Sequence, residues 1–334
     1  MSKDWSADTV LQLASSYQPV CVLAAAADLE LFEAVGREPL TAAAAASKLK
    51  ADLRGLTVLL NALVALELLD KRGDHYEVRE PLTQLLVPGT PGSVLAMVQH
   101  QANCLRRWVQ LAEVVKSGRP AVREPSVRGE SADYEAFIEA MNVISGPMAA
   151  SVVGELPELS FHHLLDVGGA SGTWTIALLA RCPDAKATIF DLPHVLPQAK
   201  ARIARASLSQ RVTLAAGDYL VDPLPAGADL VFLGAVVHSN SREQNRVLLA
   251  NCFRALLPGG RILIRDVIMK RSRTTPAYGA LFAVNMLVAT EGGGTFTFDE
   301  LREDLESAGF VDAELVRHDN RMNSVLQAYK PEHA

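Results

Sequence analysis

Apolar residues recur at helical spacing from residue 8 to about 155, and alanine is frequent among them. This spacing gives a helix one apolar face, and alanine has the highest helix propensity, so the first part of the chain is predicted to be helical. Thr41 and Asp52 can cap two of the helices, the second of which is expected to run through Leu69. A turn over 71–75 and a short hairpin at 76–78 complete the order of a winged-helix unit.

From Leu164 the pattern changes to short β-branched runs that alternate with helical stretches. This alternation predicts parallel βαβ units and therefore an α/β fold with a doubly wound sheet. We expect a helical domain over 1–154 and a sheet domain over 155–334. The predicted strands are 164–168, 187–191, 212–216, 229–234, 261–267, 313–317 and 324–329.

Composition and charge exclude several classes of protein. With 49% apolar and 21% charged residues, the 334-residue chain is neither disordered nor a coiled coil. Its net charge of −6 provides no basic surface for nucleic acid or anionic lipid. The stretch 56–69 also lacks basic residues, so the winged-helix unit is expected to support a homodimer and not to bind DNA.

Cysteine spacing and the N-terminal residues indicate in which compartment of the cell the protein is expected. The four cysteines lie far apart, which favours reduced thiols over a disulfide framework or a zinc site: Cys21, Cys104, Cys182 and Cys252. The first residues lack a signal-peptide pattern, and no apolar run is expected to reach the roughly 18 residues of a membrane span. We therefore expect a cytoplasmic protein with neither a metal nor a membrane partner.

A glycine-rich loop follows the first predicted strand. Gly168-Gly-Ala-Ser-Gly172 leads directly into a helix from Thr173. Glycines let the backbone approach a ligand closely, and a helix start presents free N–H groups. About twenty residues on, the next strand ends at Asp191, where an acid can accept both hydroxyls of a ribose. The third strand ends in Gly217-Asp218-Tyr219, whose acid suits the amino group of adenine.

The loop distinguishes between two kinds of cofactor. A dinucleotide requires Gly-x-Gly-x-x-Gly, which is not present at this position. Asp166, two residues before the loop, would repel a pyrophosphate but suits a sulfonium or an ammonium group, and S-adenosylmethionine carries both. The alternatives are a nicotinamide oxidoreductase and a winged-helix regulator that only senses S-adenosylmethionine.

His238 follows the fourth predicted strand, so it lies at the edge of the sheet where open α/β sheets bind ligands. A neutral imidazole at this place can accept a proton from an attacking hydroxyl group. The alternative is a histidine that only hydrogen-bonds at the end of a strand.

These motifs resemble the small-molecule O-methyltransferases of the plant caffeate, acetylserotonin and bacterial hydroxyneurosporene type. The resemblance extends from residue 24 to 310, and its most specific stretches are 165–172, 190–193, 217–218 and 256–264. It implies a Rossmann-like class I methyltransferase fold, an N-terminal helical dimerisation domain and metal-independent methyl transfer from S-adenosylmethionine. It also implies that a histidine at the place of His238 takes the proton from the acceptor.

Motifs and resemblance together give the candidate site residues. Those expected to bind the cofactor are Asp166, Gly168, Gly169, Ser171, Gly172, Asp191, Leu192, Gly217, Asp218 and Tyr219. Those that the resemblance places around the methyl acceptor are Gln99, Phe137, Met141, Ile144, Asn285, Met286 and Thr290. Apart from hydrogen bonding by Gln99 and Asn285 these are apolar or neutral, which suggests a flat, weakly polar, aromatic acceptor.

The chain departs from this family around His238. Many members have His-Asp-Trp where this chain has His238-Ser-Asn240, so a tryptophan near the adenosine is missing. Two acids flank the histidine in the plant enzymes. Asp266 matches one of them, Thr295 stands at the other position, and Glu291 is the acid close enough in sequence to substitute. Bacteriochlorophyllide C-methyltransferases also lack His-Asp-Trp, so C-methylation of a tetrapyrrole, quinone or polyketide-like acceptor is the alternative reaction.

Overall fold

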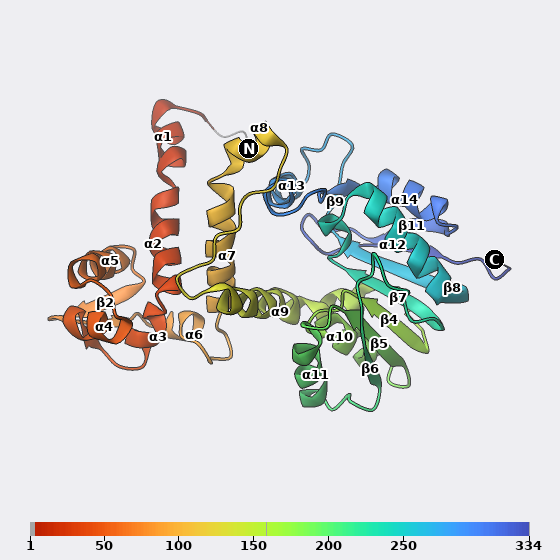
Figure 1. The fold of residues 1–334 in the computed structure, drawn as a ribbon, viewed down its shortest axis with the longest axis horizontal. Helices are drawn as coiled ribbons and strands as arrows, with labels where there is room; N and C mark the ends of the chain where they lie inside the picture. The colour runs from red at the N-terminus through yellow and green to blue at the C-terminus, as the bar shows by residue number, and fades with distance from the viewer. Residues whose placement is uncertain (1–3, 158, 334) are drawn as a thin grey trace. The chain divides into compact units, whose positions relative to one another are not determined.

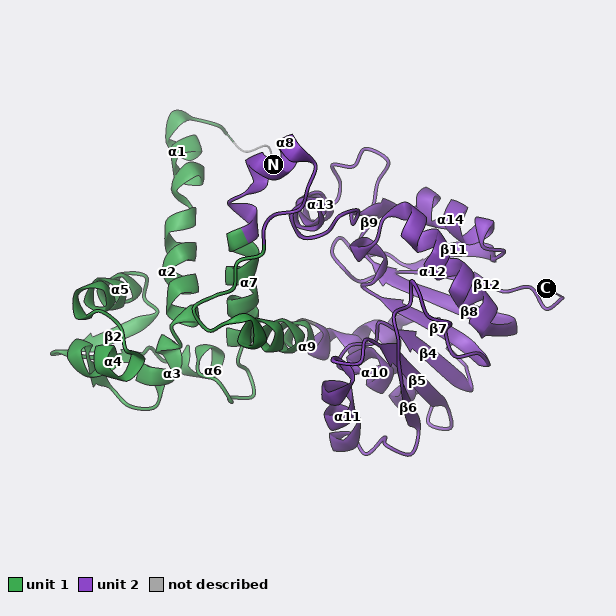
Figure 2. Ribbon diagram, viewed as in Figure 1, with its two compact units in different colours: residues 1–106, 123–144 green, residues 107–122, 145–334 purple. Residues whose placement is uncertain are grey.

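The computed structural model describes residues 4–157 and 159–333, and the chain divides into two compact units (Figure 2). The first unit contains the chain up to residue 106 together with 123–144, and the second contains 107–122 and 145–334. This division differs from the single boundary expected at 154/155. Residues 107–122 group with the second unit because Trp108 Nε1 donates to Asn285 Oδ1 at 3.0 Å and the N–H of Ala121 donates to the carbonyl of Val288 at 3.0 Å.

The first unit is mainly helical, as predicted, with one small sheet in the order β1-β3-β2. Its elements are α1 (Ala7–Ser15), α2 (Tyr17–Asp28), α3 (Leu31–Gly36), β1 (Leu40–Thr41), α4 (Ala42–Leu49), α5 (Leu53–Ala65), β2 (Leu69–Arg72), β3 (His75–Val78), α6 (Thr83–Leu86), most of α7 (Leu95–Trp108) and the first part of α9 (Glu130–Glu155).

Local capping explains where two of these helices begin. The Thr41 side chain accepts from the N–H of Ala44, and Asp52 Oδ1 accepts from the N–H of Gly55 at 2.7 Å. The predicted end of the second helix at Leu69 is wrong. The helix ends at Ala65, and Leu69 opens β2, because Glu67 adopts a positive φ of 59° that turns the chain.

Residues 7–28 and 130–155 form helices that are long and apolar enough to cross a membrane by length and composition. The expectation that no run reaches this length is therefore wrong. One or two helices of this kind are weak evidence for a membrane span, because a core helix that is apolar on most sides meets the same criterion.

The second unit is built on a seven-stranded sheet in the order β11-β12-β8-β7-β4-β5-β6 (Figure 1). Its elements are α8 (Leu111–Ser117), the end of α9, β4 (His163–Val167), α10 (Thr173–Arg181), β5 (Lys186–Asp191), α11 (Leu196–Arg205), β6 (Val212–Ala216), β7 (Ala228–Gly234), the 3-10 turn η1 (Val237–Ser239), α12 (Arg242–Ala255), β8 (Leu256–Asp266), β9 (Ile268–Met269), α13 (Ala277–Ala289), β10 (Phe296–Thr297), α14 (Phe298–Ser307), β11 (Val311–Arg317) and β12 (Ser324–Tyr329).

The doubly wound α/β sheet is as predicted. Strands β4 to β8 are parallel, whereas β12 pairs antiparallel with both β8 and β11. All seven predicted strands are present, and β8 begins earlier than expected, at Leu256. The chain runs from β4 outward to β6 and then returns to the other side of β4 as β7, so the order of strands reverses at β4. Ligands bind open α/β sheets at such a reversal, beyond the carboxyl ends of the strands.

Both faces of this sheet are buried. Leu165 joins a core with residues of α12 and α14, such as Leu248 and Leu301. The preceding residue, Leu164, joins a second core with Leu178 of α10 and the end of α9. Consecutive side chains of a strand point to opposite faces, so a run of apolar residues is what a strand covered on both sides requires.

Candidate active site

The loops that follow β4, β5 and β6 are held together at one edge of the sheet. The N–H of Gly168 donates to the carbonyl of Phe190 at 2.8 Å, and the N–H of Gly217 donates to the carbonyl of Asp191 at 3.0 Å. Parallel strands bring their carboxyl ends to the same edge, where Figure 1 shows these loops. The predicted cofactor residues are therefore neighbours in the structure.

The glycines of the loop after β4 stand where a side chain would not fit. Gly168 and Gly172 have positive φ values of 70° and 74°. A Cβ at Gly169 would lie 2.8 Å from Asp166 Cγ, and one at Gly168 would lie 2.8 Å from Val236 Cγ2. No side chain caps the start of α10, so its N–H groups can receive an anionic group such as the carboxylate of a methionine moiety.

Asp166 lies beneath this loop and is only 1% exposed. Its carboxyl accepts a hydrogen bond from Thr175 Oγ1, and burial raises its pKa to about 7. Asp166 therefore supports the loop from below. The expectation that it faces a cationic group of the ligand stays a prediction. Ser171 is also buried, with its hydroxyl 3.0 Å from that of Thr173.

Asp191, at the end of β5, stands beside the glycine loop. Its Oδ2 accepts from the N–H of Ala170 at 2.8 Å, and its Oδ1 accepts from the N–H of Leu192 at 2.7 Å. Burial raises the pKa of this carboxyl, while the two backbone N–H groups oppose the shift. Carboxylate oxygens have further lone pairs, so Asp191 can still accept from the hydroxyls of a ribose.

The loop after β6 contains the second strand-end acid. A Cβ at Gly217 would overlap the ring of Phe190, so the backbone passes close to β5 here. Asp218 Oδ1 accepts from the N–H of Leu220 at 2.9 Å. A glycine cradle, a free helix start and two strand-end acids are the donors and acceptors that S-adenosylmethionine requires.

His238 lies in η1, directly after β7, and is almost completely buried. Its Nδ1 is 3.0 and 2.9 Å from the two carboxylate oxygens of Asp266, at the end of β8. Asp266 Oδ1 also accepts from the N–H of Val267, which fixes the carboxylate. With Nδ1 donating to the carboxylate, Nε2 is the nitrogen that can accept a proton.

Two aromatic residues of α13 that sequence reasoning missed fix the other side of the imidazole. The ring of Phe282 contacts that of His238 edge-on, with 4.8 Å between the ring centroids, and the ring of Tyr278 stacks on that of Phe282, with 5.9 Å between the centroids. Their spacing of four residues, which places both on one face of a helix, was the available signal.

The expected second acid beside His238 is replaced by backbone. Thr295 is buried, and Glu291 is exposed with no hydrogen bond to His238 among the described residues, so Glu291 does not substitute. Instead, the N–H of Gly294 donates to the carbonyl of His238 at 2.9 Å. A Cβ at Gly293 would lie 2.6 Å from that same carbonyl oxygen, so this loop packs tightly against the histidine turn.

The residues expected around the acceptor divide between the two units. In the first unit the Gln99 amide donates to the carbonyl of Ala27 at 3.2 Å, so Gln99 holds α7 to α2. Phe137 is 41% exposed and its ring lies 5.2 Å from that of His100. Met141 is half-buried, and the side chain of Ile144 lies outside what the structure describes.

In the second unit, Asn285 Oδ1 is engaged by Trp108, which leaves the Asn285 amide nitrogen for a ligand. Met286 is buried. Thr290 Oγ1 donates to the carbonyl of Met286 at 2.8 Å and accepts from the N–H of Gly293 at 2.9 Å. The Thr290 hydroxyl therefore ends α13 and shapes the loop behind His238.

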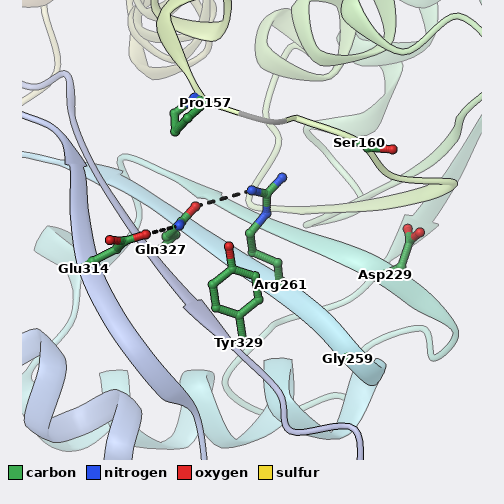
Figure 3. A pocket seen from close by; sticks show the side chains of 8 residues that line it. All are labelled: Pro157, Ser160, Asp229, Gly259, Arg261, Glu314, Gln327 and Tyr329. Carbon is green, nitrogen blue, oxygen red and sulfur yellow. Dashed lines mark hydrogen bonds between the residues drawn. The ribbon is translucent and has the colours of Figure 1, made fainter.

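A separate pocket of about 420 Å³ lies at the opposite edge of the sheet (Figure 3). Asp229, at the start of β7, lines it, whereas His238 follows the end of that strand. Arg261 donates to Gln327 Oε1 across its floor at 3.3 Å. This pocket contains none of the predicted site residues. The described residues include no cluster of three or more His, Cys, Asp or Glu side chains that could hold a metal ion.

Comparison with known proteins agrees with this geometry. The protein-family model of the O-methyltransferase domain matches residues 108–311, and the family model of the O-methyltransferase dimerisation domain matches residues 11–87. A 3-hydroxy-5-methyl-1-naphthoate 3-O-methyltransferase of Streptomyces sahachiroi is 33% identical over 91% of this chain and 90% of that protein. The acetylserotonin O-methyltransferase of Bos taurus is 32% identical over 94% and 95%.

Similarity extends to solved structures. Human N-acetylserotonin methyltransferase in complex with S-adenosylmethionine has a TM-score of 0.80 and 28% identity, covering 99% of each chain. Family model, relatives and fold therefore agree, and the chain belongs to the O-methyltransferase family of S-adenosylmethionine-dependent enzymes.

Proposed function

We propose that this enzyme methylates a hydroxyl group of a small aromatic molecule, with His238 as the general base. The observation that carries the proposal is the hydrogen bond from His238 Nδ1 to Asp266, which leaves Nε2 as the proton acceptor. When bound, S-adenosylmethionine supplies a methyl group on a positively charged sulfur, which needs no further activation.

The cofactor is held at the edge formed by the ends of β4, β5 and β6. The glycine loop 168–172 and the N–H groups at the start of α10 bind the methionine end, and Ser171 lines this loop. Asp191 accepts from the ribose hydroxyls, with Leu192 beside it. Gly217, Asp218 and Tyr219 take the adenine end. This assignment is supported by the glycine contacts and by the position of each acid at the end of a strand.

His238 accepts the proton of the attacking hydroxyl on Nε2. The carboxylate of Asp266 then stabilises the imidazolium, and the edge contact with Phe282 keeps the ring in one orientation. Removing this proton as the oxygen attacks makes the oxygen a better nucleophile, an effect typically worth about 10² to 10⁴ in rate.

The relatives support an aromatic acceptor. Besides the naphthoate enzyme, the chain is 30% identical to the tetracenomycin polyketide synthesis 8-O-methyl transferase TcmO of Streptomyces glaucescens. Phe137 and Met141 are suited to a flat ring, because aromatic and thioether groups make favourable contacts with ring faces and edges.

Nitrogen is the second candidate acceptor atom. The chain is 30% identical, over 97% of its length, to the N,N-dimethyltransferase OxyT of Streptomyces rimosus. An aromatic amine can give its proton to the same His238 Nε2, so the dyad alone does not select oxygen.

Matched acceptors test the reaction. Transfer of labelled methyl from S-adenosylmethionine would be measured with a hydroxynaphthoate, the corresponding aminonaphthoate and the unsubstituted naphthoate. The proposal is supported if the product is O-methylated and His238→Ala strongly slows its formation. An N-methyl product from the amine with no reaction of the hydroxyl compound would favour the second candidate. A C-methyl product would refute both.

We further propose a cytoplasmic homodimer formed through the first unit, whose winged-helix-like segment from α4 to β3 serves protein packing. Helices α1 and α2 expose Val10, Leu11, Leu13 and Val20. Such exposed apolar residues suit a protein partner, and the dimerisation-domain match, which begins at residue 11, includes all of them except Val10. Sedimentation should show a dimer that Leu11→Asp weakens and Val247→Asp, on α12, does not. A stable wild-type monomer would refute the dimer, and fractionation of cells tests the location.

A further inference from the structure

Three polar side chains, two of them buried and that of Tyr219 half-buried, join the end of β6 to the turn that contains His238. The hydroxyl of Tyr219 donates to Asn240 Oδ1 at 3.1 Å, Asn240 Nδ2 donates to Asn245 Oδ1 at 3.1 Å, and Asn245 Nδ2 donates to the carbonyl of Val237 at 2.9 Å. We call this series, Tyr219, Asn240 and Asn245, the amide relay. Asn240 is 3% exposed and Asn245 is 0% exposed.

The relay has a single direction. Each amide accepts through its oxygen and donates through its nitrogen, so the orientation of one amide fixes that of the next. Flipping either amide would bring two donors or two acceptors together, and a buried polar group without a partner costs about 1 to 3 kcal/mol. The relay is therefore a rigid connection.

Its two ends lie at functional positions. Val237 directly precedes His238, and its carbonyl also accepts from the N–H of Asn240 at 3.3 Å. Tyr219 directly follows Asp218 at the cofactor edge of the sheet, and Asn251 Nδ2 holds the carbonyl of Tyr219 at 3.0 Å. The relay thus connects the loop after β6 with the turn after β7.

The relay stands where this chain departs from the resembling enzymes. Asn240 occupies the position of the tryptophan in His-Asp-Trp, and Thr295 occupies that of the second acid. Within residues 4–157 and 159–333, the charged partner of the His238 ring is Asp266. Because this turn lacks those two groups, its backbone needs another restraint. Asn245 of the relay donates to the carbonyl of Val237, and the N–H of Gly294 donates to the carbonyl of His238.

We propose that Asn240 is a positioning residue that, through Asn245, holds the turn 237–239 so that Nε2 of His238 faces the acceptor. Tyr219 fixes Asn240 and so couples this turn to the loop at the cofactor edge. The inference rests on the proposed role of His238 as the base.

The experiment is a double-mutant cycle on kcat for methyl transfer with S-adenosylmethionine and the acceptor found above. Asn240→Ala is expected to lower kcat by about tenfold in the wild-type background and to have no further effect in a His238→Ala background, because residues that act through one another are not additive. Binding of S-adenosylhomocysteine should stay within about twofold. Asn320→Ala is the matched control, since it makes the same change at an exposed position outside the relay.

Each other outcome overturns the inference. Equal slowing in both backgrounds would mean that Asn240 serves only general stability. An unchanged kcat would mean that Asn240 neither positions His238 nor stabilises the active enzyme. If Asn240→Ala does not fold, Tyr219→Phe replaces it, with an expected slowing of about threefold that again vanishes in the His238→Ala background. His238→Ala measured alone separates the two proposals. Full activity of that variant refutes the role of His238 as the base. A slow His238→Ala together with a fully active Asn240→Ala refutes only the role of the relay.

Discussion

The glycine loop and the histidine turn lie at the same edge of one sheet, but they are built in different ways. Around Gly168 and Gly169 the geometry is set by the main chain, and there is no room for a Cβ at either residue. Around His238 the geometry is set by side chains, namely the carboxylate of Asp266, the ring of Phe282 and the amide relay.

The difference separates binding from chemistry. Main-chain N–H groups and strand-end acids can hold a cofactor whatever the acceptor is, whereas a proton acceptor must suit one reacting atom. Changes in the loop should therefore alter cofactor affinity, and changes in the turn should alter the rate at saturating cofactor. The following predictions test that separation.

The largest effect is expected for His238→Ala. Loss of the general base should lower kcat by about 10²-fold or more, as is typical for removal of a proton acceptor. Affinity for S-adenosylhomocysteine, measured by calorimetry, should remain within about twofold, because the histidine does not contribute to the cradle. His318→Ala, at an exposed position, is the control. Equal rates for the two variants would remove His238 from the mechanism.

Asp191→Ala should affect binding. Hydrogen bonds to a charged acceptor are worth about 1.5 to 3 kcal/mol, so affinity for S-adenosylhomocysteine should fall by about tenfold or more. The exposed Asp184, changed to alanine in the same way, should leave it unaltered. If Asp191→Ala binds as tightly as the wild type, the ribose assignment is wrong.

Gly169→Ala tests whether the main chain sets the loop. The new Cβ would lie 2.8 Å from Asp166 Cγ and 2.9 Å from Ile189 Cγ2, so the loop must shift. Overpacking costs about 1 to 3 kcal/mol, which predicts cofactor binding weaker by about tenfold while kcat at saturation changes little. Gly154→Ala, where nothing lies within 4 Å, should bind normally. A large loss of kcat at saturation would contradict the separation.

The smallest effect concerns pH and Asp166. Burial raises the pKa of this carboxyl from 3.8 to about 7, so between these values the folded protein holds a proton that the unfolded chain has released. The stability from this group is full below the unfolded pKa and is lost as the pH rises through the folded pKa. Asp166→Asn should make the fall in unfolding free energy between pH 4 and 7 smaller, by on the order of 1 kcal/mol, in denaturant titrations. Asp184→Asn should leave the slope as in the wild type.

The sequence by itself determined the α/β fold, the seven strands of the main sheet, the glycine loop and the acids at the strand ends. Strand periodicity and turn chemistry depend on residues close in sequence, and parallel strands bring their carboxyl ends together in any fold of this class. For the same reason His238 could be placed at the ligand edge from its position after a strand.

Only the tertiary structure decided the rest. It placed Asp166 under the loop, engaged Gln99 with Ala27, grouped residues 107–122 with the second unit and ended the helix before Leu69 at Ala65. It also brought Tyr219 to Asn240 and Phe282 to His238. Nothing local specifies these contacts, because they depend on which side chains the packing of distant segments brings within a few ångströms of one another.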